Sequence, residues 1–302
     1  MFIECLATSR ASGDRYFIAR TLEFLGVTDL DRAEYDSSQA FLDEALEIFR
    51  ELGDEEGTAL ILRSLGMLAQ LRGRYDEARE IYQECRAILS DLDYRQQLAW
   101  VLQHLGWLAY EEGQFGQATA FCQESSELFR RIGNETSMLW GLATSGLAAR
   151  GMGNPSRAGE LLGECLDHPL ANPISNALAH YGLGQLALDR SDPGRALEHL
   201  KQSLVLLHQD DYLRHIAIVL EAVARAAIQA GEEAQAARLF ASVEALREKH
   251  TTPLPPSERE EYQAGLEAIR AVLSPQALSR EWAVGRALTL DEAVALALRV
   301  EV

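Results

Sequence analysis

A phrase of small and apolar residues recurs through most of this 302-residue chain at a spacing of about forty. The stretch LRSLGMLAQLRGRYDEA at 62–78 returns as LQHLGWLAYEEGQFGQA at 102–118. One marker position keeps its phase through six copies, at steps of 40, 40, 40, 38 and 40 residues: Gly26, Gly66, Gly106, Gly146, Gly184 and Ala224. Repetition at a fixed period of this size predicts an elongated stack of one supersecondary unit.

Each copy has the pattern of two helices. The first carries apolar residues on one face, as at Leu102, Leu105 and Ala109. A second small residue lies seven positions after the marker, which predicts a turn through the left-handed conformation. The second helix is expected to begin near Tyr75, Phe115, Pro155 and Pro193, and proline suits the first turn of a helix. No stretch keeps a period-two alternation, so we expect almost no sheet.

The small residues indicate close helix crossing. A large side chain at Gly66 or Ala78 would separate the two helices of a pair and leave voids. One pair cannot bury its apolar face alone, so the pairs must stack. We therefore expect an all-α, right-handed α-solenoid with about six helix pairs over residues 15–256. The second helix of a partial repeat is expected at 1–14.

The C-terminal residues 257–302 are expected to form helices that cover the apolar face of the last repeat, as an open solenoid requires. Ser257 with Glu260, and Thr289 with Glu292, have the spacing of capping boxes at helix N-termini.

The repeated phrase resembles the tetratricopeptide repeat (TPR), in which Leu-Gly is followed by an alanine and then by a bulky residue. The matching residues in one copy are Leu62, Leu65, Gly66, Ala78 and Tyr82. The copies differ from the usual repeat in their length of forty rather than thirty-four residues and in lacking its closing proline.

The longer unit, with LFRRIGN between pairs, and the tail AARLFASVEALREKHTTPLPPSERE resemble the C-terminal repeat regions of bacterial LuxR-type activators and signal-transduction ATPases. The resemblance implies a sensor or partner-binding region of a bacterial regulator. The ATPase and DNA-binding parts of that family have no counterpart in the sequence.

The first residues match the middle of a repeat. ASGDRYF at 11–17 aligns with ELGDEEG at 51–57, again forty residues apart. We therefore expect a fragment of a longer polypeptide or a family member that has lost its front, which the upstream coding sequence would test.

Charge excludes some classes of partner. The formal net charge is −18, from 28 Lys and Arg against 46 Asp and Glu. A protein that binds nucleic acid directly must supply cations to the phosphates, and a protein that docks on an anionic membrane must supply cations to the lipid headgroups. The negative charge therefore argues against both kinds of partner. No apolar run is long enough to cross a bilayer, and the first residues lack the order of a signal peptide. The expected location is the cytoplasm.

The sequence offers no catalytic or metal-binding pattern. Cys5, Cys85 and Cys165 share one slot of the repeat and Cys122 lies three residues before it, so all four are expected to be small buried residues. There is no C-x-x-C, no histidine ligand spacing and no nucleotide-binding loop. His199, His208 and His215 form the densest histidine group, and we expect them to be solvated. No cofactor is expected.

The first helices should line a concave surface. Its groove positions lie six and three residues before the marker and one and four after it, on one side of the helix. The candidate binding residues at these positions are Arg63, Met67, Trp100, Gln103, Trp107, Tyr110, Trp140, Arg150 and Tyr181. Two interpretations stay open, because aromatic side chains either fill the gaps between pairs or wall a recognition pocket.

The candidate groove suggests what a ligand would look like. Arg63 and Arg150 are suited to a carboxylate or phosphate. Substituting Trp107 by alanine is expected to weaken a ligand while leaving the fold intact.

The sequence therefore favours a non-catalytic module that binds a peptide, a protein segment or other domains of a longer regulator. The alternative is a sensor of a small, sugar-like effector held in the aromatic groove. Ligand-induced thermal shifts across a metabolite panel would separate the two. An enzyme is a third class, but function must be argued from a site and the spacing selects none.

Overall fold

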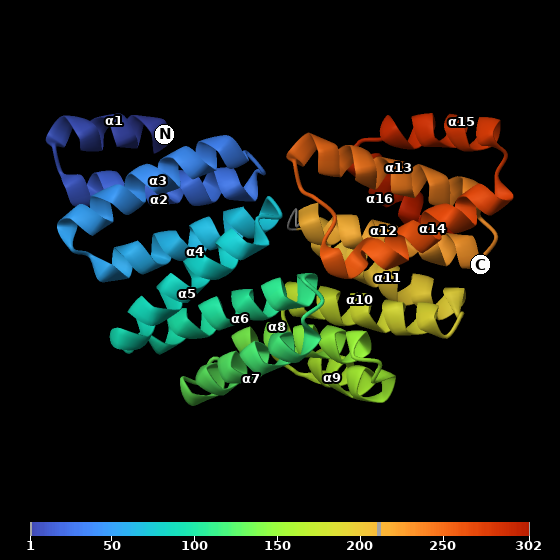
Figure 1. The fold of residues 1–302 in the computed structure, drawn as a ribbon, viewed down its shortest axis with the longest axis horizontal. Coiled ribbons are helices and arrows are strands. Elements are labelled where there is room, and N and C mark those ends of the chain that lie inside the picture. Colours follow the sequence, from blue (N-terminus) through green and yellow to red (C-terminus); the bar gives the residue numbers. More distant parts are fainter. Residues whose placement is uncertain (1, 210–212, 302) are drawn as a thin grey trace. The chain divides into compact units, whose positions relative to one another are not determined.

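The computed structural model describes residues 2–209 and 213–301, except for the side chains of residues 2–5 and 12. All regular elements in these ranges are helices, which confirms the expected all-α class. In chain order (Figure 1) they are α1 (Phe2–Ser12), α2 (Arg15–Asp31), α3 (Tyr35–Leu52), α4 (Glu55–Leu71), α5 (Tyr75–Asp91), α6 (Arg95–Glu111), α7 (Phe115–Arg131), α8 (Glu135–Gly151), α9 (Pro155–Asp167), α10 (Pro173–Asp189), α11 (Pro193–Gln209), α12 (Leu213–Gln229), α13 (Glu233–His250), the 3-10 helix η1 (Pro256–Glu258), α14 (Arg259–Val272), α15 (Pro275–Arg286) and α16 (Leu290–Leu298).

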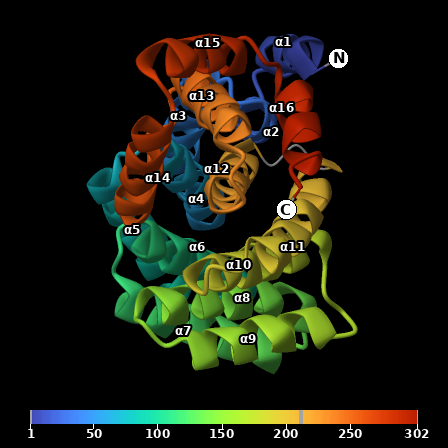
Figure 2. The same ribbon diagram turned by 90° about the vertical axis from the view of Figure 1, so that its right-hand side faces the viewer.

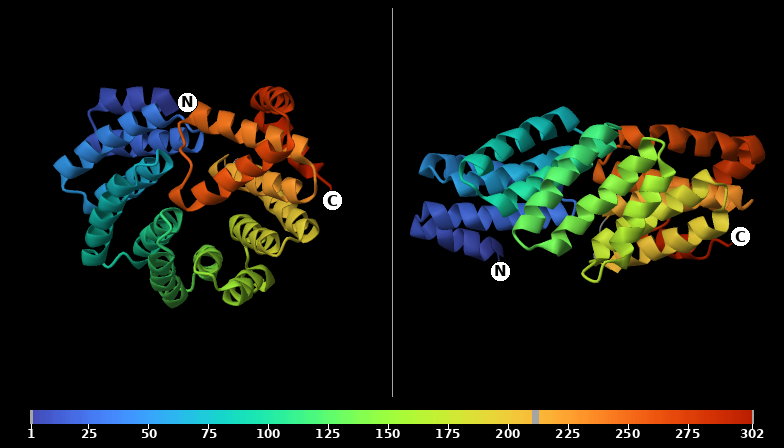
Figure 3. Two further views of the ribbon diagram at one scale, coloured as in Figure 1. Left: turned by 45° about the vertical axis from the view of Figure 1, so that its right-hand side comes forward. Right: turned by 90° about the horizontal axis from the view of Figure 1, so that it is seen from below.

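The chain divides into two compact units, residues 1–108 (unit 1) and 109–302 (unit 2), with the boundary inside α6. In unit 1, α2 packs on α3 and α4 packs on α5. In unit 2, the packed pairs are α8 with α9, α10 with α11 and α12 with α13. Figure 3 shows these pairs from two further directions. Within the described ranges, no helix combines the length and apolar character that crossing a membrane demands.

The turn inside each repeat has the predicted left-handed conformation. Four copies place a glycine there, with φ of 70° at Gly73, 77° at Gly113, 72° at Gly153 and 81° at Gly231. Ala33 and Ser191 occupy the same position in other copies with φ of 58° and 54°. The positive φ therefore belongs to the repeat and not to glycine alone.

The marker glycines lie where the two helices of a pair approach most closely. A Cβ added to Gly66 would lie 2.5 Å from the ring of Tyr82, and one added to Gly146 would lie 2.7 Å from Leu162. At Gly184 the added atom would lie 2.7 Å from Leu200. Each contact is closer than side chains tolerate, which explains the small residue at this step of the repeat.

We expect Gly184→Ala to lower the free energy of unfolding by about 1–2 kcal/mol, because overpacking outweighs the helix propensity that alanine adds. Gly163→Ala in α9 is the matched control, since an added Cβ there meets nothing within 4 Å. That variant should be neutral or more stable than the parent by up to about 1 kcal/mol. Urea melts of both variants check the prediction, and equal effects would contradict the close-crossing explanation.

The cysteine slot is buried, but it also makes polar contacts. The Cys85 thiol donates to the carbonyl of Ala59 at 3.1 Å, and the Ser203 hydroxyl donates to the carbonyl of Ala177 at 2.8 Å. In both cases the acceptor lies 26 residues earlier, on the first helix of the pair. Cys85, Cys122 and Cys165 are buried free thiols, as expected, whereas the side chain of Cys5 lies outside the described residues.

Of the two capping boxes predicted in the C-terminal residues, one forms and the other does not. Thr289 and Glu292 form the predicted capping box at the start of α16. The box predicted at Ser257 and Glu260 is wrong, because Ser257 lies inside η1 and α14 begins at Arg259 without a side-chain cap. The two prolines before Ser257 impose this local geometry.

The three C-terminal helices pack against different parts of unit 2. α15 packs against α13, and α16 contacts α11, α12 and α13. α14 lies on the opposite side of α12 and α13 from α16 (Figure 2). All three C-terminal helices therefore contact α12 or α13, the last pair of the stack.

Candidate functional site

The nine candidate groove residues divide between the two units. Unit 1 holds Arg63 and Met67 on α4 and Trp100, Gln103 and Trp107 on α6; unit 2 holds Tyr110 on α6, Trp140 and Arg150 on α8 and Tyr181 on α10. Four of the nine are buried: Gln103, Trp107, Tyr110 and Tyr181. The other five are half-buried. Three of the five aromatic candidates, Trp107, Tyr110 and Tyr181, are therefore buried and do not form the open aromatic wall that the sequence suggested.

Trp107 is the residue most affected by this finding. Only 5% of its surface is exposed. Truncating a buried aromatic to alanine typically costs about 3–5 kcal/mol. We therefore expect Trp107→Ala to destabilise the fold, and a binding test belongs at less buried positions.

In unit 1, Arg63 is a half-buried cation with no ion pair among the residues that the structure describes. Burial lowers the pKa of His104, and the charge of Arg63 lowers it further by a smaller amount. The ring of His104 stacks on that of Tyr82, with centroids 5.6 Å apart and an interplanar angle of 6°. The charge of Arg63 also acts on Glu23 of α2, where it opposes the rise in pKa that burial causes.

In unit 2, Arg150 and a second arginine hold one carboxylate between them. The Arg150 guanidinium donates to both oxygens of Asp189 at 2.8 and 2.7 Å, and also to Glu261 Oε1 at 2.6 Å. Arg225 Nη1 lies 2.7 Å from the other oxygen, Glu261 Oε2. The two arginines come from α8 and α12, whereas Glu261 is on α14. We call the side of α8, α10 and α12 that meets α14 the inner face of unit 2.

Tyr181 belongs to the same network. Gln185 Nε2 donates to the Tyr181 hydroxyl at 2.6 Å, and Arg225 donates to the amide oxygen of Gln185. Tyr181 is 2% exposed, and burial raises the pKa of its hydroxyl well above the usual value. Its hydroxyl is thus fixed as a neutral hydrogen-bonding group that positions Gln185 and, through it, Arg225.

A second group of charges lies beside the first. Arg247 on α13 forms an ion pair with Glu221 on α12 and lies 3.5 Å from Glu258 at the end of η1. Arg214 pairs with Glu111. Glu111, Glu221 and Glu258 are all buried. Buried charges persist only where opposite charges and hydrogen bonds compensate them, so this group depends on its arginines.

Burial sets the protonation of these carboxyl groups. Burial, with a smaller contribution from the nearby Glu221 carboxylate and against the opposing effect of Arg247, raises the pKa of Glu258 to about 8. Burial also raises the pKa of Glu221, with Arg247 again opposing the rise. The Glu258 carboxyl is therefore largely protonated at neutral pH, and the contact between η1 and the inner face is sensitive to pH.

Sequence reasoning missed Arg225 and Glu221 although its own rule points to them. They lie one residue after and three residues before Ala224, the marker of the sixth copy. Arg247, Glu258 and Glu261 lie outside the first helices, so no groove rule could find them. Arg150 and Glu261 are 111 residues apart, which leaves no local pattern in the sequence.

The histidines are less solvated than expected. His199, His208 and His215 are all half-buried. His199 Nδ1 lies 3.0 Å from His180 Nδ1, and His208 Nε2 lies 3.2 Å from a carboxylate oxygen of Asp291. Burial lowers the pKa of His215 to about 3, with Arg214 adding to the effect.

No group of three or more histidine, cysteine, aspartate or glutamate side chains suited to a metal ion occurs in the described part of the chain. Burial raises the pKa of the Cys85 and Cys122 thiols to about 12 and that of Cys165 to about 11. Thiols protonated to this extent are poor nucleophiles.

Comparison with known families gives a match to part of the repeat region. Residues 17–91 and 57–130 match the family described as tetratricopeptide repeat. No curated protein matches the sequence.

Among solved structures, NprR in complex with its cognate peptide NprX is similar to this chain with a TM-score of 0.62 and 13% identity, over 89% of this chain and 78% of NprR. The Rap conjugation gene regulator of plasmid pLS20, in complex with the Phr* peptide, gives a TM-score of 0.60 and 13% identity, over 87% and 78%. BtubC from P. vanneervenii gives a TM-score of 0.55 and 17% identity, over 70% and 90%. At these identities the likeness concerns the fold, which is a TPR-like α-solenoid.

Proposed function

We propose that this chain is a non-catalytic peptide-binding module whose ligand lies on the inner face of unit 2. One observation carries the proposal. Arg150 and Arg225, from two different repeats, hold the single carboxylate of Glu261, which belongs to a separate helix. A face that already receives a helix through charged side chains has the chemistry needed to receive a peptide.

The structural neighbours support the same class of ligand. NprR and the Rap regulator were each solved with a bound peptide, and each shares the fold over most of both chains. The finer part of the proposal is that this chain serves as the sensor or partner-binding region of a bacterial regulator of the LuxR or signal-transduction ATPase type. That part rests on the resemblance of the tail and of the forty-residue unit. Pull-down from the source cells and the identity of neighbouring genes test it.

Selection from a random peptide library on the full chain tests the peptide-binding function. We expect enriched peptides that bind the parent and lose about tenfold or more in affinity for Arg150→Gln, because a charge-assisted contact is removed. Arg157→Gln is the matched control, since the one ion pair of Arg157 among the described residues is an exposed pair with Glu160 on α9. Its affinities should equal those of the parent.

Two outcomes count against the proposal. Peptides that bind Arg150→Gln as tightly as the parent would place the site elsewhere. Absence of enriched peptides, together with specific thermal stabilisation by one member of a metabolite panel, would favour the small-effector sensor instead.

A further inference from the structure

Residues 251–272 form a distinct segment on the inner face of unit 2. The segment consists of the loop TTPLP, the short helix η1 and α14. Its three prolines, Pro253, Pro255 and Pro256, restrict the backbone and break the helical path between α13 and α14. A second break follows at Leu273 and Ser274, before α15 begins at Pro275. α14 is therefore linked to its neighbours by non-helical connections at both ends.

The side of α14 that meets the inner face fits closely. The seam between the two holds a cavity of only about 10 Å³. Tyr262 packs edge-on against Phe240, with ring centroids 5.4 Å apart and an interplanar angle of 79°. A Cβ added to Gly265 would lie 2.6 Å from the Phe240 ring. The complementarity at this seam resembles that between a binding surface and its ligand.

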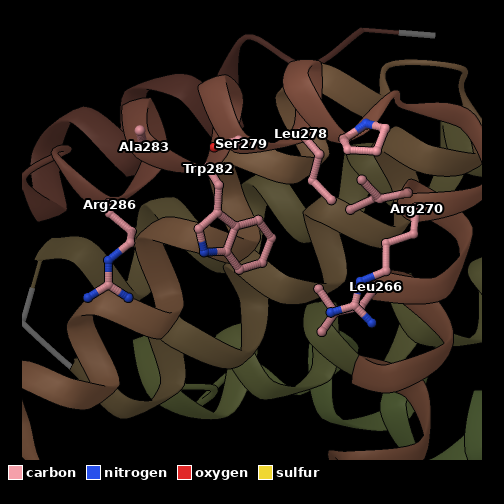
Figure 4. Close-up of a pocket in the computed structure, with 9 residues that line it drawn as sticks. Leu266, Arg270, Leu278, Ser279, Trp282, Ala283 and Arg286 are labelled. Atoms are coloured by element: carbon pink, nitrogen blue, oxygen red, sulfur yellow. The ribbon is translucent and has the colours of Figure 1, made fainter.

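The other side of α14 is loosely packed. A cavity of about 480 Å³ separates it from α15, with Trp282 and Leu278 on the α15 side and Leu266 and Arg270 on the α14 side (Figure 4). α15 itself packs firmly on α13, where an added Cβ at Gly285 would meet the backbone carbonyl oxygen of Arg238 at a distance shorter than any real contact. Movement of α14 would thus leave α15 in place.

Apolar burial contributes little to the position of α14. Its buried residues are Gly265, Leu266 and Ile269, whereas eleven residues of α12 are buried. The Glu261 contacts to Arg150 and Arg225 therefore supply a large share of the attachment. A helix that is bounded by non-helical residues and has few buried apolar residues belongs to the less stable part of a structure.

We propose that η1 and α14 act as an internal ligand of the inner face, and that an acidic peptide displaces them by placing its own carboxylate between Arg150 and Arg225. The inference rests on the proposed peptide-binding function and names the class of peptide. The geometry favours a carboxylate because both guanidinium groups converge on the two oxygens of Glu261 at 2.6 and 2.7 Å. Asp189 keeps Arg150 oriented when Glu261 leaves.

The first test measures release of the segment without any added peptide. Hydrogen exchange of residues 259–272 is followed in the full chain and in two variants, Glu261→Gln and Gly265→Ala. The first removes a charge and the second introduces a steric clash with Phe240. Both should speed exchange of α14 by about tenfold or more while exchange of α12 stays unchanged. Glu267→Gln, at an exposed position of α14 without an ion pair among the described residues, is the control and should match the parent.

The second test supplies the segment in trans. A labelled peptide of residues 255–272, PPSEREEYQAGLEAIRAV, is titrated against the full-length Glu261→Gln and Glu267→Gln variants. The peptide should bind Glu261→Gln about tenfold or more tightly than Glu267→Gln, because the inner face of the former is vacated more readily. The same peptide with glutamine at position 261 should bind about tenfold more weakly.

The outcomes separate this inference from the proposed function. If α14 exchanges as slowly as α12 in both releasing variants, or if the peptide in trans binds neither variant, α14 is a fixed structural helix and the inference is wrong. If library peptides bind the parent without accelerating exchange of residues 259–272, the inference fails while the peptide-binding function stands. If release occurs but no library peptide binds, the peptide-binding function fails instead.

Discussion

Arg247→Met is expected to lower the free energy of unfolding by about 3–5 kcal/mol at pH 7.5, because the change leaves the buried Glu221 carboxyl without its cation. Arg247 contacts Glu221 twice, whereas it lies 3.5 Å from Glu258, which is largely protonated at this pH. Methionine has a similar length and adds no polar group, so the loss reflects charge more than volume. Urea denaturation followed by circular dichroism measures the effect.

The loss of stability caused by Arg247→Met should become smaller as the pH falls towards 5. Burial raises the pKa of Glu221 and of Glu258 above their unfolded values, that of Glu258 to about 8. Between the unfolded and folded values, the folded chain binds protons that the unfolded chain does not, so stability rises on acidification in this range. In the variant, protonation of both carboxyls replaces part of the compensation that Arg247 supplied.

Arg157→Met provides the control for Arg247→Met. Arg157 lies 2.9 Å from Glu160, but both side chains are more than half exposed. Exposed pairs contribute at most about 1 kcal/mol, so this variant should melt close to the parent at every pH. If the two variants lose the same stability, the buried charge group has no special role in holding unit 2 together.

The repeat architecture could be predicted because its determinants are local and recur. Helix starts at Tyr75, Phe115, Pro155 and Pro193 agree with the structure to the residue. The marker glycines and the left-handed turns also lie at the positions that the forty-residue spacing predicted. Each signal depends on a few neighbouring residues and is repeated in several copies, which removes most chance matches.

The candidate site was predicted less well, because burial across a stack depends on which faces meet. The spacing rule selected Arg150 and Tyr181, and the structure brings both into the inner-face network. It could not tell that Trp107 and Tyr110 would be buried. An aromatic residue beside the apolar stripe has the same pattern whether it faces a neighbouring helix or a ligand.

The charged contact that orients α14 could not be predicted. Its sequence reveals an apolar stripe at Leu266 and Ile269, and that stripe fits any apolar partner. The contact that orients the helix, between Glu261 and two arginines of distant repeats, has no sequence signature in a chain with 46 acidic residues. The proposal that this helix is displaceable therefore comes from the fit of its two sides, close at the inner face and open towards α15.

Mild acid is expected to destabilise unit 1 through His104. Burial, with a further effect of Arg63, lowers the pKa of this histidine to about 3, whereas an unfolded histidine titrates near 6.5. Between these values the unfolded chain binds a proton that the folded chain does not, so stability falls as the pH falls below about 6.5. At pH 5 the loss is about 2 kcal/mol relative to pH 7.5, and it grows by roughly 1.4 kcal/mol for each further pH unit. Unit 2 contains His215 with the same direction of shift, but Glu221 and Glu258 there respond in the opposite sense.

His104→Phe should remove this dependence. Phenylalanine keeps an aromatic ring against Tyr82, where the histidine ring now stacks, but cannot take up a proton. Urea melts at pH 7.5, 6 and 5 measure the slope of stability against pH for the variant and the parent, each carrying Trp140→Phe and Trp282→Phe so that the fluorescence comes from Trp100 and Trp107 of unit 1. A parent whose unit 1 stability is flat from pH 7.5 to 5, or a His104→Phe variant with the parent's slope, would show that the ring of His104 is hydrated enough to protonate within the folded chain.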